Sequence, residues 1–534
     1  MNPRGKVLVA VAALSLAASG VGAQPPAAPP QSKVSSWFGV PTPGPVSDWT
    51  KPTFAANSDA YGMPATTWAK PAPAPLQATK LMADVRTIVG FARERRDAGD
   101  LLYGRISGMP GEPKTVQWAI GRMKAAGIAD AHTEEFKIDR PLYVPTKWEV
   151  RIKGDDSFGA GTRDVVLQSS MALPTSKTLS APITGQLVFI GRGSPAELAN
   201  VDLRGKIAVV NVVPDGSLFA SREKGVAREA VARGAVGVIN AIESPGNLLF
   251  YDSRYGCGDA PCYAVGGDDG AFLESVIGRA AAAGKSAQLK AQLSVTAETR
   301  NNLTALNGVA TIPGKSKEIV IVNAHADSWF EGADDNADGL SVLVGLAEYY
   351  ARRPKPDRTL VFMVSGGHHT GNGPAAFIAA HPEIMKEAVL VMNLEHLAQI
   401  DVSQGPRLDP GASGYRSGVW VASTAETQKQ TGAVNTTPYV TQLMGEASKK
   451  FGVVTVYQPT QSVPGDLGAY QRTGIPAVQL ISSEVYYHSS GDTPATISPP
   501  GLERVALFFQ AFIDAIAKAP KDKIVRPATA RAGG

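Results

Sequence analysis

From residue 318 onward, short apolar runs alternate with segments of helical periodicity. Four runs have the length of buried strands: 319–323, 359–364, 389–393 and 477–481. In the segment 339–353, apolar residues recur at helical spacing. Strands that alternate with helices are typical of a mostly parallel sheet covered by helices on both faces. The sequence therefore predicts an α/β fold with a mostly parallel, mixed sheet flanked by helices.

The preceding part of the chain has a different pattern. A chain of 534 residues is too long for one compact core, so we expect two or more domains. Helical periodicity marks 80–95 and 116–126, whereas short β-type runs at 186–190 and 206–213, with one helix at 222–233, follow. This change of pattern predicts a β-rich insert between about 179 and 296.

The amino terminus has the parts of a secretory signal. Arg4 and Lys6 precede an apolar stretch, 7–18, and the small residues of 21–23 form a cleavage site. A membrane anchor is the alternative, but the stretch is shorter than the roughly 20 residues that a spanning helix needs. We therefore expect a periplasmic or secreted protein with no membrane span after signal removal. Pro-rich sequence from 24 to 78 predicts a linker or a strap on the surface.

Export agrees with the two cysteines, Cys257 and Cys262, which we expect to form a small disulfide in an oxidising compartment. Two free thiols are the alternative. The net charge is +4, and no run of five like charges occurs, so the sequence predicts no nucleic-acid partner. The oligomeric state is not determined by these features.

The histidines are concentrated just beyond the predicted strands. Five of the seven lie there: His325, His368, His369, His396 and His488. In open α/β sheets, side chains at the carboxyl ends of the strands converge on one crevice. Asp334 and Asp335 precede the helix at 339–353 and can face the same crevice. Imidazole and carboxylate are ligands that zinc accepts, and two cysteines are too few for a thiol-only site, so we predict a polynuclear metal site.

These positions belong to motifs that resemble a known family, the two-zinc exopeptidases, which include secreted bacterial aminopeptidases and the glutamate carboxypeptidase type. The matching segments, in family order and spacing, are Ala324-His325-Ala326-Asp327-Ser328, Gly332-Ala333-Asp334-Asp335-Asn336-Ala337-Asp338-Gly339, Asn393-Leu394-Glu395, Tyr487-His488-Ser489-Ser490-Gly491-Asp492-Thr493, Tyr103-Gly104-Arg105 and Asn302-Leu303-Thr304-Ala305-Leu306. The resemblance covers most of residues 80–518. The stretch 188–239 also resembles the protease-associated domain, a β-rich insert that helps to cover or select substrate.

The composition, the sequence patterns and the resemblance together predict a division of the chain into six parts. They are a signal peptide (1–23), a Pro-rich linker or strap (24–78), the first part of a peptidase domain (79–178), a protease-associated domain (179–296), the second part of the peptidase domain with the metal site (297–520), and a tail (521–534).

The resemblance also implies two zinc ions, with a single ion as the alternative. Asp335 would bridge them, His325 and Glu395 would hold one ion, and His369 and His488 the other. Two further residues match supporting positions. Asp327 would buttress a metal-binding histidine, unless it is only a turn residue at a strand end, and Tyr487 would steady the tetrahedral intermediate, unless it is a core residue.

The chain departs from the family pattern at two places. His368 and His369 stand where the family has two glutamates, a general base and a zinc ligand, and Glu395 stands where it has aspartate. A histidine still coordinates zinc, but it removes a negative charge from the site. His368 is then the candidate proton acceptor. Two alternatives stay open: His396 replaces Glu395 as a ligand, or Asp334 exchanges roles with Asp335.

The family implies an exported zinc metallopeptidase, an aminopeptidase-like exopeptidase that cleaves peptide or related amide bonds through a metal-bound hydroxide. The alternative is a catalytically weak or inactive protein that binds metal or peptide on the same scaffold. A serine hydrolase is disfavoured because the chain has no Gly-x-Ser-x-Gly turn. The sequence does not determine the natural substrate or which end of a peptide is attacked.

Overall fold

The computed structural model describes residues 36–50, 55–57, 71–214, 221–404, 420–426, 429–453, 455–457, 463–482 and 485–525. The predicted signal peptide, 1–23, lies outside these residues, as do parts of the linker, 24–78, and most of the tail, 521–534. Within the described ranges, no helix combines the length and the apolar character needed to cross a membrane.

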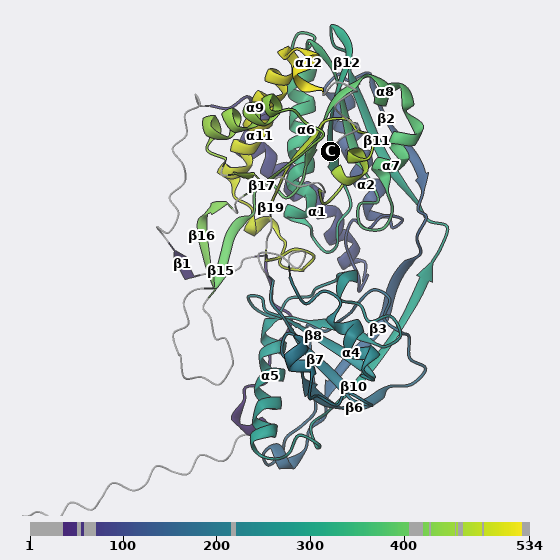
Figure 1. Ribbon diagram of the computed structural model, residues 1–534, viewed down its shortest axis with the longest axis vertical. Coiled ribbons are helices and arrows are strands. Elements are labelled where there is room, and N and C mark those ends of the chain that lie inside the picture. Colours follow the sequence, from purple (N-terminus) through teal and green to yellow (C-terminus); the bar gives the residue numbers. More distant parts are fainter. Residues whose placement is uncertain are drawn as a thin grey trace, which may run out of the picture.

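Two α/β units lie one above the other in Figure 1, and the upper one is built on an eight-stranded sheet. Its strands are β2 (Asp130–Lys137), β11 (Thr304–Ile312), β12 (Ser316–His325), β13 (Arg358–Ser365), β14 (Ala388–Leu394), β17 (Lys429–Val434), β18 (Thr455–Tyr457) and β19 (Ala477–Ser482). Their order is β18-β17-β19-β14-β12-β13-β11-β2. The central strands β19, β14, β12 and β13 run parallel, whereas β17, β11 and β2 pair antiparallel with their neighbours, β17 with β19 and β11 with both β13 and β2. The four apolar runs form the parallel centre of the sheet. They are apolar along their whole length because both faces of the sheet are covered.

Helices cover both faces of this sheet. One face packs against α1 (Ala78–Asp97), α2 (Gly111–Ala125), α6 (Asp338–Ala351), α9 (Pro438–Phe451) and α11 (Pro499–Lys518) in one apolar cluster. The other face packs against α7 (Gly373–Ala380), α8 (Pro382–Glu387) and α10 (Leu467–Gln471). The predicted helices at 80–95, 116–126 and 339–353 are confirmed as α1, α2 and α6, and so is the mixed, mostly parallel fold class.

The lower unit contains a second eight-stranded sheet, in the order β4-β3-β10-β6-β7-β8-β9-β5. Its strands are β3 (Leu142–Ile152), β4 (Val165–Val166), β5 (Met171–Ala172), β6 (Ile183–Phe189), β7 (Ile207–Val212), β8 (Gly237–Ile242), β9 (Cys262–Val265) and β10 (Lys290–Arg300). α4 (Val226–Ala232) packs on one face and α5 (Gly267–Ala282) on the other. The sheet extends beyond both ends of the predicted insert, because β3 pairs with β10 from Leu142 to Ile152, a long-range partnership without a local sequence signal.

Two antiparallel ribbons carry the chain between the units. β2 pairs with β11 in the upper sheet, and the strands that continue from them, β3 and β10, pair in the lower sheet. Between the two pairings, the Ile138 N–H donates to the Leu303 carbonyl at 2.9 Å. The chain therefore enters and leaves the lower unit through two adjacent antiparallel strands, so that the lower unit is an insertion into the upper one.

A second contact joins the units beside the carboxyl end of β19. The Tyr251 N–H donates to the His488 carbonyl at 3.0 Å, and the Ser490 N–H donates to the Leu249 carbonyl at 3.0 Å. Tyr486 and Tyr487 pack in the same apolar cluster as residues of the lower unit. The lower unit thus lies directly against the loop that follows β19.

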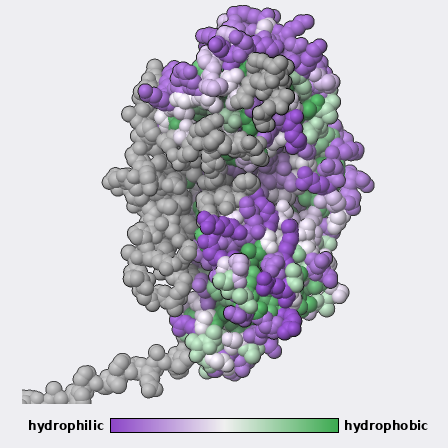
Figure 2. All heavy atoms as spheres, viewed as in Figure 1, coloured by the Kyte–Doolittle hydropathy of each residue, from purple (hydrophilic) through white to green (hydrophobic). Residues whose placement is uncertain are grey.

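The remaining elements are small. β1 (Ala55–Asn57), β16 (Trp420–Glu426) and β15 (Ile400–Gln404) form a three-stranded sheet. Short helices are η1 (Trp37–Gly39), η2 (Ala74–Leu76), η3 (Asp156–Phe158), α3 (Pro195–Leu198), η4 (Ser253–Tyr255), η5 (Ala333–Ala337), η6 (Pro494–Thr496) and α12 (Lys521–Ile524). The predicted disulfide joins Cys257 and Cys262, with a Cα–Cα distance of 5.6 Å. Figure 2 shows hydrophilic side chains over much of the upper unit on one face and apolar ones among those of the lower unit.

Candidate metal centre

The five histidines predicted to converge do lie together at the carboxyl ends of the central strands. His325 is the last residue of β12, and His368 and His369 follow β13. His396 follows β14, and His488 follows β19. All five are mostly or fully buried, as expected for side chains enclosed in the crevice between helices and the lower unit.

Asp335 lies at the middle of this cluster, in η5. Its Oδ1 is 3.2 Å from His325 Nε2 and 3.3 Å from His396 Nε2. Its Oδ2 is 3.3 Å from His369 Nε2 and 3.4 Å from His488 Nε2. The two ring nitrogens on the Oδ2 side are 3.0 Å apart. The two oxygens of one carboxylate therefore face two separate pairs of imidazoles, and each set of three residues can hold a metal ion.

Glu395 lies next to this arrangement. Its Oε1 is 4.0 Å from His396 Nε2 and 3.8 Å from His368 Nε2, and its Oε2 accepts a hydrogen bond from Asn393 Nδ2 at 2.6 Å. The carboxylate is still near enough to His325 and His368 to form a further candidate ligand group. The structure thus brings Glu395 to the site and also His396, the alternative ligand in the sequence analysis.

Buried carboxylates contact the ring nitrogens of the candidate ligand histidines that face away from Asp335. Asp327 accepts hydrogen bonds from the backbone N–H groups of His368 and His369 at 3.0 and 2.9 Å, and its Oδ2 is 3.0 Å from His369 Nδ1. Such a contact fixes the orientation of a ligand ring. Although burial lowers the pKa of His369, the charges of Asp335 and Asp327 raise it to about 9. Asp327 therefore contacts the ring of one candidate ligand histidine and the backbone of both residues that follow β13.

The support of His488 comes from the inserted unit. Asp252 precedes η4, is 3% exposed, and places its Oδ2 at 3.2 Å from His488 Nδ1. Arg254 pairs with the same carboxylate, and its guanidinium lies 5.2 Å from the centre of the Tyr487 ring. Tyr487 in turn stacks on His488 with the ring centres 3.7 Å apart. No sequence motif marks Asp252, and 236 residues separate it from His488, so it was not predicted.

His368 has its own carboxylate partner, Asp466, just before α10. His368 Nδ1 is 2.9 Å from Asp466 Oδ1, and the His368 ring stacks on His325 at 4.0 Å between centres. Ser365 Oγ and Asn323 Nδ2 donate to Asp466 Oδ2. Burial raises the pKa of Asp466, but the charge of His368 and these hydrogen bonds hold it below its usual value. The carboxylate is therefore ionised, and it leaves His368 Nε2 facing the crevice.

The loop that leads to Asp335 is held by Arg105. The Arg105 side chain is fully buried and donates to the carbonyls of Ala326, Glu331 and Gly332 at 2.9, 2.5 and 2.9 Å. Asp492 then accepts from the backbone N–H groups of Asp334 and Asp335. These bonds explain why the segments around 104 and 492 belong with the ligand motifs.

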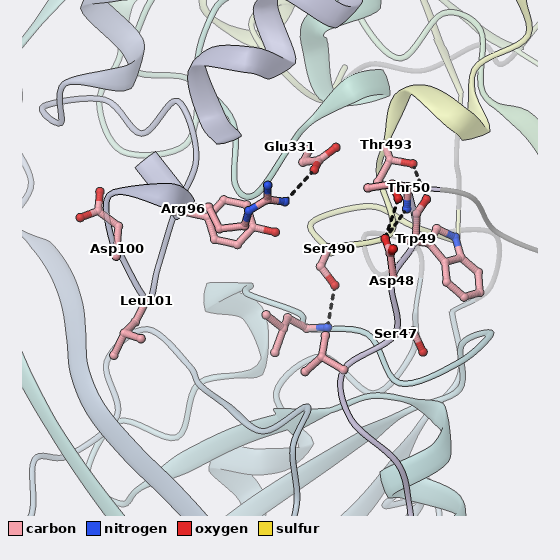
Figure 3. A pocket seen from close by; sticks show the side chains of 14 residues that line it. Ser47, Asp48, Trp49, Thr50, Arg96, Asp100, Leu101, Glu331, Ser490 and Thr493 are labelled. Carbon is pink, nitrogen blue, oxygen red and sulfur yellow. Dashed lines mark hydrogen bonds and ion pairs between the residues drawn. The ribbon is translucent and has the colours of Figure 1, made fainter. Parts of the chain in front are cut away.

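A cavity of about 310 Å³ opens beside the cluster, with His368, Asp466 and Tyr487 among its lining residues. A second cavity, of about 400 Å³, lies elsewhere, between residues 46–50, the end of α1 and the turn at 490–493 (Figure 3). None of the five histidines is among its described lining residues. Its polar groups bond to the protein itself: Arg96 pairs with Glu331, and the Ser490 hydroxyl accepts from the Leu249 N–H. The metal centre therefore belongs to the first cavity.

With this geometry in view, comparison with known proteins places the chain. Residues 307–513 match the model of Peptidase family M28. The M28 segment contains Asp335 and all five clustered histidines. The predicted relationship to the bacterial zinc exopeptidases is thereby confirmed for this segment. A search of the curated proteins found no match.

Solved structures similar to the chain include bacterial aminopeptidases and a peptidase precursor. A zinc aminopeptidase from Bacillus subtilis is 20% identical with a TM-score of 0.56, and the match covers 85% of this chain and 100% of that one. The aminopeptidase from Aneurinibacillus sp. strain AM-1 is 21% identical with a TM-score of 0.53, over 84% and 95% of the two chains. A peptidase M28 precursor from Shewanella amazonensis SB2B is 19% identical with a TM-score of 0.61, over 84% and 97%. At these identities the likeness establishes the fold.

Proposed function

We propose that the chain is an exported, zinc-dependent exopeptidase, aminopeptidase-like, that hydrolyses peptide or related amide bonds. The single observation that carries the proposal is the Asp335 carboxylate, whose two oxygens each face two imidazole nitrogens at 3.2 to 3.4 Å. A structural core has no need of four histidines around one buried aspartate. The M28 match and the aminopeptidase relatives support the same reaction class.

The residues present fit zinc. His325 Nε2 and Asp335 Oδ1 are buried, and neither makes a hydrogen bond with any part of the chain that the structure describes. Imidazole and carboxylate match the ligand preference of zinc. When bound, zinc ions supply Lewis acidity and lower the pKa of a coordinated water. His325, Asp335 and His396, with Glu395 beside them, would hold one ion, and Asp335, His369 and His488 the other.

His368 is the residue that we assign to proton transfer. Its Nδ1 is engaged by Asp466, so its Nε2 is the ring nitrogen that can accept a proton from the crevice. Asp466 is a positioning residue, because it orients the ring of His368. To Tyr487, whose ring stacks on His488, we assign the stabilisation of a developing oxyanion.

The experiment that tests the proposal combines metal analysis with hydrolysis of aminoacyl, carboxyl-terminal and cyclic-amide substrates. We expect close to two zinc ions per chain and hydrolysis that a chelator abolishes. His325→Ala and His488→Ala should lose metal, whereas His368→Ala should keep metal and lose turnover. His132→Ala is the matched control, since His132 lies on β2 with its side chain 46% exposed, outside the cluster.

Each result separates the proposal from its alternative. Bound zinc without hydrolysis of any substrate would favour a metal- or peptide-binding protein on an M28 scaffold. Metal loss in the His368 variant equal to that in the His325 variant would make His368 a ligand. Export is tested by sequencing the amino terminus of the mature protein, for which we expect Gln24.

A further inference from the structure

The cavity beside the metal centre is bounded by residues that touch the ligand histidines. His368 stacks on His325 with the ring centres 4.0 Å apart, and Tyr487 stacks on His488 at 3.7 Å. The cavity measures about 310 Å³, at the small end of the roughly 300–1,000 Å³ that ligand sites occupy. A substrate group bound in this cavity would therefore lie one or two substrate residues away from the amide bond held at the metal centre.

Three arginines from three parts of the chain line this cavity. Arg140 lies between β2 and β3, Arg254 lies in η4 of the inserted unit, and Arg472 follows α10. The one acidic side chain among the described lining residues is Asp466, which His368 already engages. The described wall is thus positively charged.

Two of these arginines are available to a ligand. The side chain of Arg472 makes no hydrogen bond or ion pair with any other described residue, and only its backbone N–H is bonded, to the Tyr470 carbonyl. Arg140 pairs with Asp139 at 3.8 Å, and both side chains are more than two-thirds exposed, so this contact is weak. Arg254 is mostly committed to Asp252, but its charge adds to the potential of the cavity.

We propose that this cavity binds a carboxylate of the substrate, close to the amide bond that is cleaved. The proposal rests on the function proposed above and names its substrate class: short peptides with an acidic group next to the scissile bond. Guanidinium forms paired, charge-assisted hydrogen bonds with carboxylate. A substrate ammonium group would be repelled by these arginines. Among the described lining residues, the one carboxylate, that of Asp466, is already paired with His368. The carboxylate belongs to the free carboxyl terminus of a dipeptide or to an acidic side chain, and both present the same chemistry.

The test compares three peptides with the zinc-loaded protein: Ala-Ala, Ala-Ala amide and Ala-Glu amide. We expect kcat/KM for Ala-Ala to exceed that for Ala-Ala amide by about tenfold or more, because hydrogen bonds between charged groups are the stronger kind. Arg472→Gln and the double variant with Arg140→Gln should reduce this ratio toward one, mainly by raising KM for Ala-Ala. Arg204→Gln is the matched control, since that side chain is 84% exposed and lies outside the cavity.

The outcomes distinguish the sources of the carboxylate and the two proposals. Ala-Glu amide cleaved as well as Ala-Ala shows that a side-chain carboxylate suffices, whereas preference for Ala-Ala alone assigns the terminal carboxylate. Equal cleavage of all three peptides, unaltered in the arginine variants, overturns this inference and leaves the peptidase proposal standing. A zinc-loaded protein that cleaves none of the three peptides but hydrolyses another substrate of the panel above overturns this inference alone, whereas one that hydrolyses no substrate at all overturns both.

Discussion

Asp252 offers the sharpest test of how the inserted unit serves the metal centre, and we expect Asp252→Asn to weaken one zinc site only. The replacement keeps the size of the side chain but removes the charge that faces His488 Nδ1 at 3.2 Å. Although burial raises the pKa of Asp252, contacts with His488 and Arg254 hold it well below its usual range, so the charge is present at any working pH. Loss of such a partner typically costs about 10- to 100-fold in metal affinity.

That range corresponds to about 1.4–2.7 kcal/mol. The measurement is a competition titration of the zinc-free protein with a chromophoric chelator, which resolves two binding steps. We expect one step to weaken by at least about tenfold and the other to stay within about twofold, since the ring that Asp252 contacts is that of His488, a candidate ligand of the ion held with Asp335 and His369. Asp202→Asn is the control, because Asp202 lies in the same unit with its side chain 52% exposed. Unchanged affinities in a folded variant, or equal weakening of both steps, would refute the reasoning.

Four further predictions follow from single contacts. Because two buried aspartates raise the pKa of His369 to about 9, protons compete with zinc, and we expect zinc affinity to rise by about tenfold per pH unit from pH 6 to 7.5; a flat titration would contradict this. Arg105→Ala leaves three buried carbonyls without their donor, so chemical unfolding should show a loss of about 3 kcal/mol or more, and a loss below about 1 kcal/mol would count against the role given to Arg105. Burial lowers the pKa of His381 but two glutamates raise it overall, so its contribution is complete below the unfolded pKa of about 6.5 and is lost as pH rises through the folded value; His381→Gln should cost up to about 1 kcal/mol at pH 6 and close to nothing at pH 9.5, as measured by unfolding at both. Replacing Cys257 and Cys262 by serine should lower the unfolding free energy by about 2 kcal/mol, the loop-closure value for so short a loop, and a variant as stable as the parent would show that the bond adds nothing.

The sequence by itself determined the fold class and predicted which side chains lie together at the candidate site. Four apolar runs with helical segments between them are enough for a parallel centre, since strands covered on both faces must be apolar along their whole length. The convergence of the residues directly after such strands can be predicted from the sequence, because the carboxyl ends of parallel strands lie at one edge of the sheet. His325, His369 and His488 were predicted on this basis, together with Asp335 from the motif.

Tertiary structure decided which neighbours surround these residues. At the end of β14, the adjacent residues Glu395 and His396 both point toward the crevice, because His396 adopts a positive φ of 52° and turns the chain. Strand alternation alone would send them to opposite faces.

Asp466 and Asp252 lie outside the predicted ligand motifs, and only folding brings them to His368 and His488. Asp252 arrives because residues 249–251 of the inserted unit bond to the backbone at 488–490. Local patterns encode the strands and the residues at their ends. The carboxylates that orient those residues come from distant segments, whose positions depend on packing between whole units.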